Sequence, residues 1–418
     1  MNKSNKTGPL AGLKVLDLSR VLAGPWATQT LADYGADIWK IENPDGGDDT
    51  RKWGEKITPS ASEQLSDEPQ SLEYRGDITA YYLCANRGKF SLAIDIKTKQ
   101  GQAIVRSLAE KADVLVENFK VGNLSRYGLD YANLGKLNPK LIYCSITGFG
   151  QTGPYSNQAG YDAMIQASAG LMSLTGERAG TPQKVGVAVS DLTTGMYAVS
   201  AILAALYHRN QTNKGQYIDL SLFDTQVGWL ANQGMSYLVS GEVPHRQGSI
   251  HPSIVPYQPI QCKDKSIMLA VGNDRQFATC CKLLELSELA TDKRFFSNNQ
   301  RIKNHSKLIS LLEQKFATQP ADYWLGLLSR AEVPCGPIND LKQVFEHPQI
   351  KARGTRFSLD HPLLGSQPQI ANPVKFSDTP INYPKAAPTL GEDTTQVLQT
   401  ELAFSASQLV ELKKQGII

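Results

Sequence analysis

The residues from Leu13 to Ile41 decide the fold, and they read LKVLDLSRVLAGPWATQTLADYGADIWKI. Residues 13–18 form an apolar run with the length of a buried strand, and residues 36–41 form a second one. The stretch 26–33 between them is typical of a short helix and ends at Gly35. A strand, a helix and a strand at this spacing make a βαβ unit with a right-handed crossover. The N-terminal part of the chain is therefore predicted to build a parallel sheet.

The same alternation of strands and helices continues after this unit. Further strands are predicted at 91–96, 113–117, 141–146, 185–189 and 217–222, and helices at 98–112, within 124–137, at 192–209 and at 223–240. The stretch 43–70 is rich in Gly, Asp, Ser and Pro, and is predicted to be a long loop. Strands that alternate with helices in this way indicate an α/β protein whose sheet is doubly wound and mostly parallel.

The length of the chain indicates two domains. Its 418 residues exceed what one hydrophobic core usually organises. We expect a large, Rossmann-like domain from residues 1–224 and 331–418. Residues 261–329 have a different pattern, a pair of strands followed by helices. A second, smaller α+β domain is therefore expected at 225–330.

The composition excludes several classes of protein. Hydrophobic residues make up 41% and charged residues 20% of the chain, which is ordinary for a globular protein. The 43 basic and 40 acidic residues are too evenly balanced to indicate a nucleic-acid partner. The polar N-terminus lacks the apolar core of a signal peptide, and the longest apolar stretch, 196–207, is shorter than the roughly 20 residues that span a bilayer. We expect a cytoplasmic protein with no membrane partner.

The motifs of several common chemistries are missing. The turn from Arg20 to Pro25 after the first strand holds one glycine, whereas a dinucleotide pyrophosphate needs several. Glu42 ends the second strand, where an NAD enzyme would hold its ribose, but without the glycines an NAD-dependent oxidoreductase is a disfavoured alternative. There is no P-loop, no His-Glu-x-x-His and no Gly-x-Ser-x-Gly. The six cysteines and six histidines show no metal-binding spacing, so we expect reduced thiols and no metal.

Asp191 is the acid whose position suggests chemistry. It stands where a predicted strand ends and a predicted helix begins, and ligands of open α/β sheets bind at the carboxyl ends of strands. An aspartate at a helix start is also a common N-cap, and the two roles are compatible. Asp162, in Gly160-Tyr161-Asp162, opens another predicted helix and has the same two interpretations.

The chain resembles the class III CoA-transferases, the CaiB/BaiF family, along nearly its whole length. The central block Ser190-Asp191-Leu192-Thr193-Thr194-Gly195-Met196 is similar to the catalytic motif of that family. The other matching stretches are Leu13–Asp17, Val21–Pro25, Val116–Phe119, Val333–Pro337 and Leu390–Glu392. The resemblance implies that Asp191 is a nucleophile that briefly carries the acyl group.

The implied chemistry is an exchange of activated acyl groups. A carboxylate that attacks an acyl-CoA thioester forms a mixed anhydride, and the CoA thiolate then converts the aspartyl group into an enzyme-bound thioester. A second acid collects CoA through a second anhydride. Water must be kept out because anhydrides hydrolyse. We also expect the amides at the helix start, close to Asp191, to stabilise the charge that develops during the reaction.

The resemblance also implies where CoA binds and how the chain assembles. CoA and acyl-CoA are substrates on the large domain, with no permanently bound cofactor, and the partners are acyl-CoA and a free carboxylic acid. The family members form interlocked homodimers. The residues implied in CoA binding are Val21 and Ala23, which border it, Asn118 and Phe119, which contact it, and Arg126, which reaches a phosphate or the adenine region.

A further inference concerns the reaction. Racemases of the same fold carry a histidine where this chain has Tyr161, and tyrosine, with an ordinary pKa of about 10, is a poor base near neutral pH. An α-methylacyl-CoA racemase-like activity is therefore a disfavoured alternative, and Tyr161 and Asp162 are candidates for catalytic support. A non-enzymatic acyl-CoA binder is a further alternative.

The likeness is greatest to the succinyl-CoA:glutarate (hydroxymethylglutarate) CoA-transferases within the family. It rests on Gly46–Arg51, Ser249–Gln258 and Gly272–Thr279. It implies transfer between short dicarboxylic acids, from succinyl-CoA to a glutarate-like acceptor. A second carboxylate needs a cationic partner, and the candidates are Arg51, Arg246 and His251.

Overall fold

The structure is a computed structural model, and it describes residues 7–57 and 78–418. The chain divides into two compact units. Unit 1 comprises Met1–Leu171, Val185–Leu238 and Lys351–Ile418, and unit 2 comprises Met172–Lys184 and Val239–Ile350. The expected domain boundaries were 224/225 and 330/331, so the smaller unit starts and ends later than expected and also takes in the short segment 172–184.

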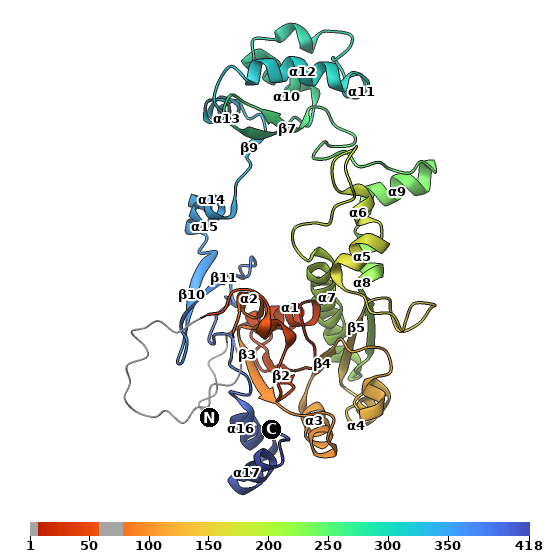
Figure 1. The fold of residues 1–418 in the computed structure, drawn as a ribbon, viewed down its shortest axis with the longest axis vertical. Coiled ribbons are helices and arrows are strands. Elements are labelled where there is room, and N and C mark those ends of the chain that lie inside the picture. The colour runs from red at the N-terminus through yellow and green to blue at the C-terminus, as the bar shows by residue number, and fades with distance from the viewer. Residues whose placement is uncertain (1–6, 58–77) are drawn as a thin grey trace. The chain divides into compact units, whose positions relative to one another are not determined.

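A six-stranded parallel sheet organises unit 1 (Figure 1). Its order is β3-β2-β1-β4-β5-β6, and every neighbouring pair is parallel. The chain winds outward from β1 to one edge and then from β4 to the other, which makes the sheet doubly wound, as predicted. The strands are β1 (Lys14–Asp17), β2 (Asp37–Glu42), β3 (Lys89–Ala93), β4 (Val114–Glu117), β5 (Ile142–Thr147) and β6 (Tyr217–Ser221).

Helices cover both faces of this sheet, because successive strand residues point to opposite sides. Val15 packs in one core with α1 and α7, and Leu16 packs in the other core with α3, α4, α16 and α17. The bounds of these helices are α1 (Ala23–Asp33), α7 (Val189–Thr212), α3 (Lys99–Lys111), α4 (Tyr131–Leu137), α16 (Thr394–Leu402) and α17 (Ala406–Lys414).

The helix α7 corrects two sequence predictions. Residues 185–188 are not a strand, and the helix already begins at Val189. At 24 residues it is also long and apolar enough to span a bilayer by length and composition, contrary to the expectation for residues 196–207. Half of its most apolar window is buried, and a core helix of a globular unit passes the same test.

The remaining elements of unit 1 connect and flank the sheet. The predicted loop at 43–70 contains the 3-10 helix Asp49–Lys52, and its residues 58–70 lie outside the described part of the chain. The other elements are α2 (Ala80–Asn86), the 3-10 helix Leu124–Tyr127, α5 (Asp162–Ser168), α8 (Leu222–Gly228), and the antiparallel pair β10 (Arg356–His361) and β11 (Gly365–Ile370). Three helices cross the boundary with unit 2, namely α6 (Leu171–Leu174), α9 (Ala231–Ser240) and α15 (Pro348–Ala352).

Unit 2 has its own small sheet and its own core. The sheet is antiparallel in the order β7-β8-β9, and helices pack around it. The strand pair followed by helices agrees with the pattern read at 261–329. Its strands are β7 (Tyr257–Gln261), β8 (Ser266–Ala270) and β9 (Cys335–Pro337), and its helices are α10 (Asp274–Leu283), the 3-10 helix Ser287–Ala290, α11 (Asn298–Lys303), α12 (His305–Phe316), α13 (Ala321–Arg330) and α14 (Leu341–Glu346); α15 (Pro348–Ala352) leads out of it.

Candidate active site

Asp191 is the third residue of α7, and a second carboxylate caps this helix from outside. The N-cap position is held by Ala188, which has no polar side chain to offer the first amides of the helix. Asp162 Oδ1 accepts the backbone N–H of Ser190 at 2.8 Å and that of Asp191 at 3.4 Å. Asp162 is the first residue of α5 and follows the N-cap Tyr161. The two aspartates singled out from the sequence therefore meet, and neither is itself an N-cap residue.

Buried amide side chains hold this pair of helix starts in place. Gln166, one turn after Asp162, donates from Nε2 to Asp162 Oδ2 at 2.6 Å, and its Oε1 accepts the N–H of Val185 at 2.8 Å. Ser190 Oγ donates to Gln226 Oε1, in α8, at 2.7 Å. Gln166, Ser190 and Gln226 are fully buried. Sequence reasoning missed both glutamines, since no local pattern distinguishes them.

The environment of Asp191 favours the protonated acid more than water does. Burial, and then the negative charge of Asp162, raise the pKa of Asp191 to about 7. The residue keeps part of its surface exposed, so a substrate can reach it. Burial, followed by the charge of Asp191, also raises the pKa of Tyr81 in α2 to about 12. The ring of Tyr81 meets that of Trp53 edge-on at 5.5 Å, and neither aromatic residue was singled out from the sequence.

A glycine brings the start of α1 against the helix that carries Asp191. Gly195 lies one turn after Asp191, and a Cβ there would stand 2.7 Å from the carbonyl oxygen of Ala23 and 3.1 Å from Trp26 Cδ1. Only a residue without a side chain allows this approach of the two helices. Ala23, the first residue of α1, is itself buried. The turn after β1 is thereby placed beside the start of α7.

That turn is held from two sides. Asn118, just after β4, accepts the N–H of Arg20 through Oδ1 at 2.8 Å and donates from Nδ2 to the Arg20 carbonyl at 2.7 Å. Val21 has a φ of +67°, a left-handed conformation that costs a β-branched residue about 1–3 kcal/mol. Its N–H donates to both carboxylate oxygens of Asp48, at 3.2 and 3.3 Å. Asn118 therefore positions the turn. The resemblance implied only that Asn118 contacts CoA.

The other two residues implied in CoA binding after β4 are Phe119, which follows Asn118 directly, and Arg126. The N–H of Phe119 donates to Glu117 Oε2 at 2.8 Å, and the Arg20 guanidinium lies 5.7 Å from the centroid of the Phe119 ring. Arg126, in the 3-10 helix after β4, is exposed and bonds Asn123 Oδ1. All five implied residues follow β1 and β4, adjacent strands at the point where the winding of the sheet reverses. Ligands of open α/β sheets bind at such a point.

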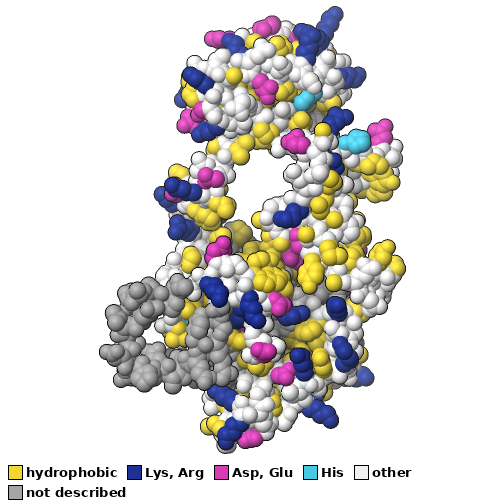
Figure 2. All heavy atoms as spheres, in the orientation of Figure 1, with side chains coloured by type: hydrophobic (Ala, Val, Ile, Leu, Met, Phe, Trp, Pro, Cys, Tyr) yellow, Lys and Arg dark blue, Asp and Glu magenta, His cyan; other side chains and the backbone are white. Residues whose placement is uncertain are grey.

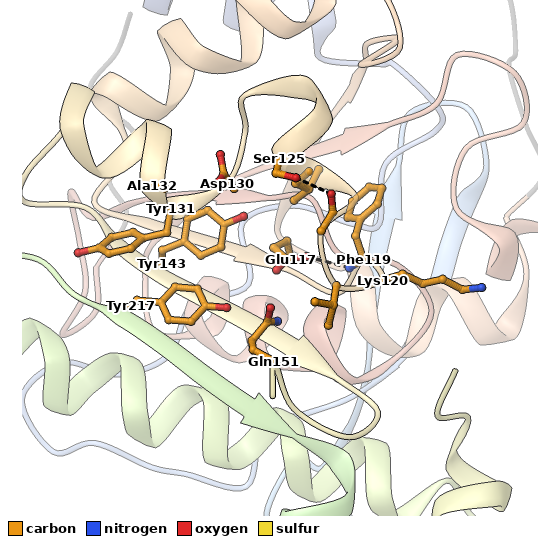
Figure 3. A pocket seen from close by; sticks show the side chains of 13 residues that line it. Glu117, Phe119, Lys120, Ser125, Asp130, Tyr131, Ala132, Tyr143, Gln151 and Tyr217 are labelled. Atoms are coloured by element: carbon orange, nitrogen blue, oxygen red, sulfur yellow. Dashed lines mark hydrogen bonds between the residues drawn. The ribbon is translucent and has the colours of Figure 1, made fainter. Parts of the chain in front are cut away.

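A pocket of about 350 Å³ opens beside Phe119 (Figure 3). The rings of Tyr131, Tyr143 and Tyr217 lie together on one side of it, with centroids 5.4–5.9 Å apart, and Glu117 and Phe119 lie on the other. Burial raises the pKa of Glu117 to about 7. The full lining is Glu117, Phe119, Lys120, Val121, Gly122, Leu124, Ser125, Asp130, Tyr131, Ala132, Tyr143, Gln151 and Tyr217. It does not include Asp191 or Asp162, so this pocket adjoins the implied CoA residues without containing the candidate nucleophile.

Comparison with known proteins gives the same assignment. The model of CoA-transferase family III matches residues 10–394. This chain belongs to CoA-transferase family III. It is 47% identical to the succinate–glutarate CoA-transferase of Agrobacterium fabrum, over 94% of this chain and 96% of that one. It is 41% identical to the succinyl-CoA:glutarate CoA-transferase of Homo sapiens, over 99% of this chain and 91% of that one.

A solved structure agrees with the fold of this family III CoA-transferase. The crystal structure of a CaiB/BaiF family protein from Brucella suis superimposes with a TM-score of 0.82 at 46% identity, covering 94% of this chain and all of that one. The protein is therefore an enzyme that transfers CoA, and the oxidoreductase and the non-enzymatic binder are set aside. Its reacting substrates are CoA thioesters, as the family name implies.

The three candidate partners for a substrate carboxylate lie in different environments in the structure. Arg51 is 1% exposed, and its guanidinium bonds Glu42 through Nε at 2.8 Å and Nη2 at 2.7 Å, as well as the carbonyl of Pro388. A buried guanidinium that already bonds a carboxylate through two nitrogens is not available to a substrate. The expectation that Arg51 holds a substrate carboxylate is therefore corrected, and Arg51 has a structural role.

Arg246 and His251 lie in unit 2 and remain predictions. Arg246 donates to the carbonyls of Glu177 and Gly180, at 3.3 and 2.7 Å, and keeps part of its surface exposed. His251 Nδ1 accepts the N–H of Ser253 at 3.1 Å, and its ring lies 5.0 Å from that of Tyr257. The ring is therefore oriented with Nε2 left for another partner.

Proposed function

We propose that this enzyme moves CoA between succinyl-CoA and a glutarate-like dicarboxylic acid, with Asp191 as the nucleophile. The observation that carries the proposal is Asp191 itself. It is a carboxylate with a pKa raised to about 7, fixed at the start of α7 by Asp162, next to the turn that the family resemblance assigns to CoA. The printed activities of the relatives from A. fabrum and H. sapiens supply the substrate pair.

The reaction consists of four balanced substitutions at carbonyl carbon. A carboxylate oxygen of Asp191 attacks the succinyl thioester, the C–S bond breaks, and CoA thiolate leaves a succinyl–aspartyl anhydride. The thiolate then attacks the aspartyl carbonyl, and succinate leaves with its electron pair. The carboxylate of the acceptor acid attacks the aspartyl thioester, which forms a second anhydride and frees the thiolate again. Thiolate attack on the acceptor's acyl carbon yields the new acyl-CoA and restores Asp191.

The structure supports one part of this scheme and corrects another. Partial burial suits intermediates that water would hydrolyse. The amides at the start of α7, however, already have acceptors, and cannot stabilise an oxyanion as expected from the sequence. Ser190 and Asp191 donate to Asp162, while Val189 and Leu192 donate to the carbonyls of Val187 and Ala188. Charge that develops on the substrate carbonyl must be stabilised by other donors.

The racemase alternative and the assembly of the chain each need a separate test. Tyr161 stands where the racemases have a basic histidine, and tyrosine, with an ordinary pKa of about 10, is a poor base near neutral pH, which favours transfer over proton abstraction. An exchange of deuterium into the α-carbon of an acyl-CoA would instead support a racemase. For the assembly we propose a homodimer.

The exposed surface of α9 supports the homodimer. No residue of this helix is buried in the single chain, and Figure 2 shows hydrophobic side chains gathered over it. Met235 is 57% and Leu238 73% exposed. An apolar surface of this kind is typical of one that a partner covers. Light scattering should give twice the chain mass for the wild type and a lower mass for Met235→Glu/Leu238→Glu; a monomeric wild type would overturn the homodimer.

A CoA-exchange experiment tests the transfer. The enzyme is mixed with succinyl-CoA and one of several free acids, including glutarate, hydroxymethylglutarate, itaconate, malate and oxalate, and the products are followed by mass spectrometry. We expect glutaryl-CoA to appear with an equal amount of succinate. Exchange with another acid alone would correct the acceptor. If succinyl-CoA stays intact with every acid, succinyl-CoA is not the donor.

A further inference from the structure

We propose that Asp48 is a positioning residue for the CoA-binding turn, because it holds Val21 in its left-handed backbone conformation. This inference rests on the proposed function, in which CoA binds at that turn. Asp48 touches neither Asp191 nor any group assigned to the reaction, and neither the family resemblance nor the relatives assign it a role.

The carboxylate of Asp48 ties the turn to the segment that follows β2. It is 1% exposed and uses both oxygens. Oδ1 accepts the N–H and the hydroxyl of Thr50, at 3.0 and 2.8 Å, and both oxygens accept the N–H of Val21. The bond to Val21 links two segments 27 residues apart, whereas the bonds to Thr50 are local. A carboxylate is a stronger acceptor for an amide than a neutral group is, so the Val21 bond can offset backbone strain.

Asp48 is itself fixed by two side chains of β2. Lys40 Nζ donates to Asp48 Oδ2 at 2.9 Å and to the carbonyl of Ser19 at 2.9 Å. Glu42 Oε2 accepts the N–H of Asp48 at 3.0 Å. Since Ser19 directly precedes the turn, Lys40 connects the residue before the turn with the carboxylate that holds Val21.

The arrangement of charge around Asp48 indicates positioning rather than general stability. Six ionisable side chains, none more than 4% exposed, lie in β1 and β2, in the segment after β2 and at the start of β3: Asp17, Glu42 and Asp48 as acids, Lys40, Arg51 and Lys89 as bases. The three ion pairs measure 2.7–3.0 Å, and the six charges sum to zero. Burial of ions costs desolvation, so apolar side chains of equal volume stabilise a core as well or better. The role proposed for this network is therefore to fix the geometry of the turn.

Asn118 does not replace Asp48 in this role. It bonds the N–H and the carbonyl of Arg20, one residue earlier, and leaves the N–H of Val21 to Asp48. Without Asp48, Val21 is expected to relax toward negative φ, since L residues other than glycine avoid the left-handed region. The peptide groups that border CoA would then turn away from it.

A double-mutant cycle between the two residues tests the proposal. Glycine adopts positive φ without strain. With glycine at position 21, the loss of Asp48 should therefore weaken CoA binding less, because no side chain then opposes the left-handed conformation. We measure the Kd of CoA by calorimetry, and kcat and KM for the acyl-CoA, in Asp48→Ala, Val21→Gly and the double variant. Asp48→Ala should weaken CoA binding by roughly tenfold or more and raise KM more than it lowers kcat. In the Val21→Gly background, Asp48→Ala should weaken CoA binding by less than about threefold.

Two further variants serve as a backup and a control for this cycle. Asp48→Asn keeps the volume and one acceptor oxygen, and should give a smaller loss that Val21→Gly reduces in the same way; it serves if Asp48→Ala does not fold. Asp33→Ala is the matched control, because it breaks another buried ion pair of unit 1, with Arg87 at 2.6 Å, at the far end of α1. It should lower the melting temperature and leave the Kd of CoA within about twofold.

The outcomes separate this inference from the proposed function. A folded Asp48→Ala that binds CoA like the wild type would overturn the positioning role. So would an equally large loss in both backgrounds, because that would mean that Asp48 acts independently of residue 21. A wild-type enzyme that binds no CoA would overturn the proposed function together with this inference.

Discussion

Asp162 Oδ1 accepts the backbone N–H of Asp191 at 3.4 Å, so the carboxylate that orients the candidate nucleophile also opposes its ionisation. The same oxygen holds the N–H of Ser190 at 2.8 Å and thereby supplies the cap that Ala188 cannot. The pairing gives the start of α7 a defined position, and the charge of Asp162 adds to burial, the larger cause, in raising the pKa of Asp191 to about 7. Both effects are measurable.

Replacement of the nucleophile should abolish transfer while leaving binding. In Asp191→Asn the side chain keeps its size but can no longer form an anhydride, so kcat should fall by roughly a thousandfold or more. The Kd of CoA should change little, because the proposed CoA contacts lie on the turn after β1 and the segment after β4. Single-turnover mass spectrometry on the wild type should show a covalent adduct on Asp191. A folded Asp191→Asn with near-native turnover would contradict the assignment.

The pH dependence of the first half-reaction should report Asp191. Only the ionised carboxylate attacks, and its pKa is raised to about 7. The rate should therefore rise about tenfold per pH unit below pH 7 and level off above it. Asp162→Asn removes the neighbouring negative charge but keeps an acceptor oxygen for the amides. The pKa of Asp191 should then fall, and the acid limb should move to lower pH. A shift in the opposite direction would show that Asp162 does not act on Asp191 through its charge.

The close approach of α1 and α7 should be sensitive to a single methyl group. In Gly195→Ala the added Cβ would stand 2.7 Å from the Ala23 carbonyl oxygen, so the helices must separate. The free energy of unfolding should fall by about 1–3 kcal/mol, and activity should fall with it. Gly228→Ala in α8 is the control, because its Cβ meets no atom within 4 Å, and it should be neutral or slightly stabilising. Equal unfolding midpoints in urea for the two variants would refute the packing argument.

The two arginines proposed from sequence for a substrate carboxylate should behave differently. Arg51→Ala leaves Glu42 buried without its partner and should destabilise the fold by about 3–5 kcal/mol. Arg246→Ala should fold normally. If Arg246 holds the distal carboxylate, its loss should raise KM for glutarate but not for a monocarboxylic acceptor. An unchanged ratio of the two KM values would exclude Arg246 and leave His251 as the candidate.

The comparison of prediction and structure shows which features have local causes. The strands of the large sheet were predicted within a few residues, because apolar runs between turn residues specify a buried strand. The segment from Val185 to Val189 was predicted as a strand for the same reason, and wrongly. There the N–H of Val185 donates to Gln166, and the N–H of Ser190 donates to Asp162, so contacts with α5 decide where the helix starts.

The sequence by itself determined the parallel sheet, its winding and the family, because those depend on the periodicity of apolar residues and on motifs that are contiguous in the chain. It also pointed to Asp191 as the candidate nucleophile, since this residue stands in such a motif. The tertiary structure alone decided that Asp162 caps α7, that Arg51 is buried against Glu42, and that Asp48 holds Val21. Each of these depends on a hydrogen bond or ion pair between segments that only the folded sheet and its helices bring together, and no local pattern of residues records such a contact.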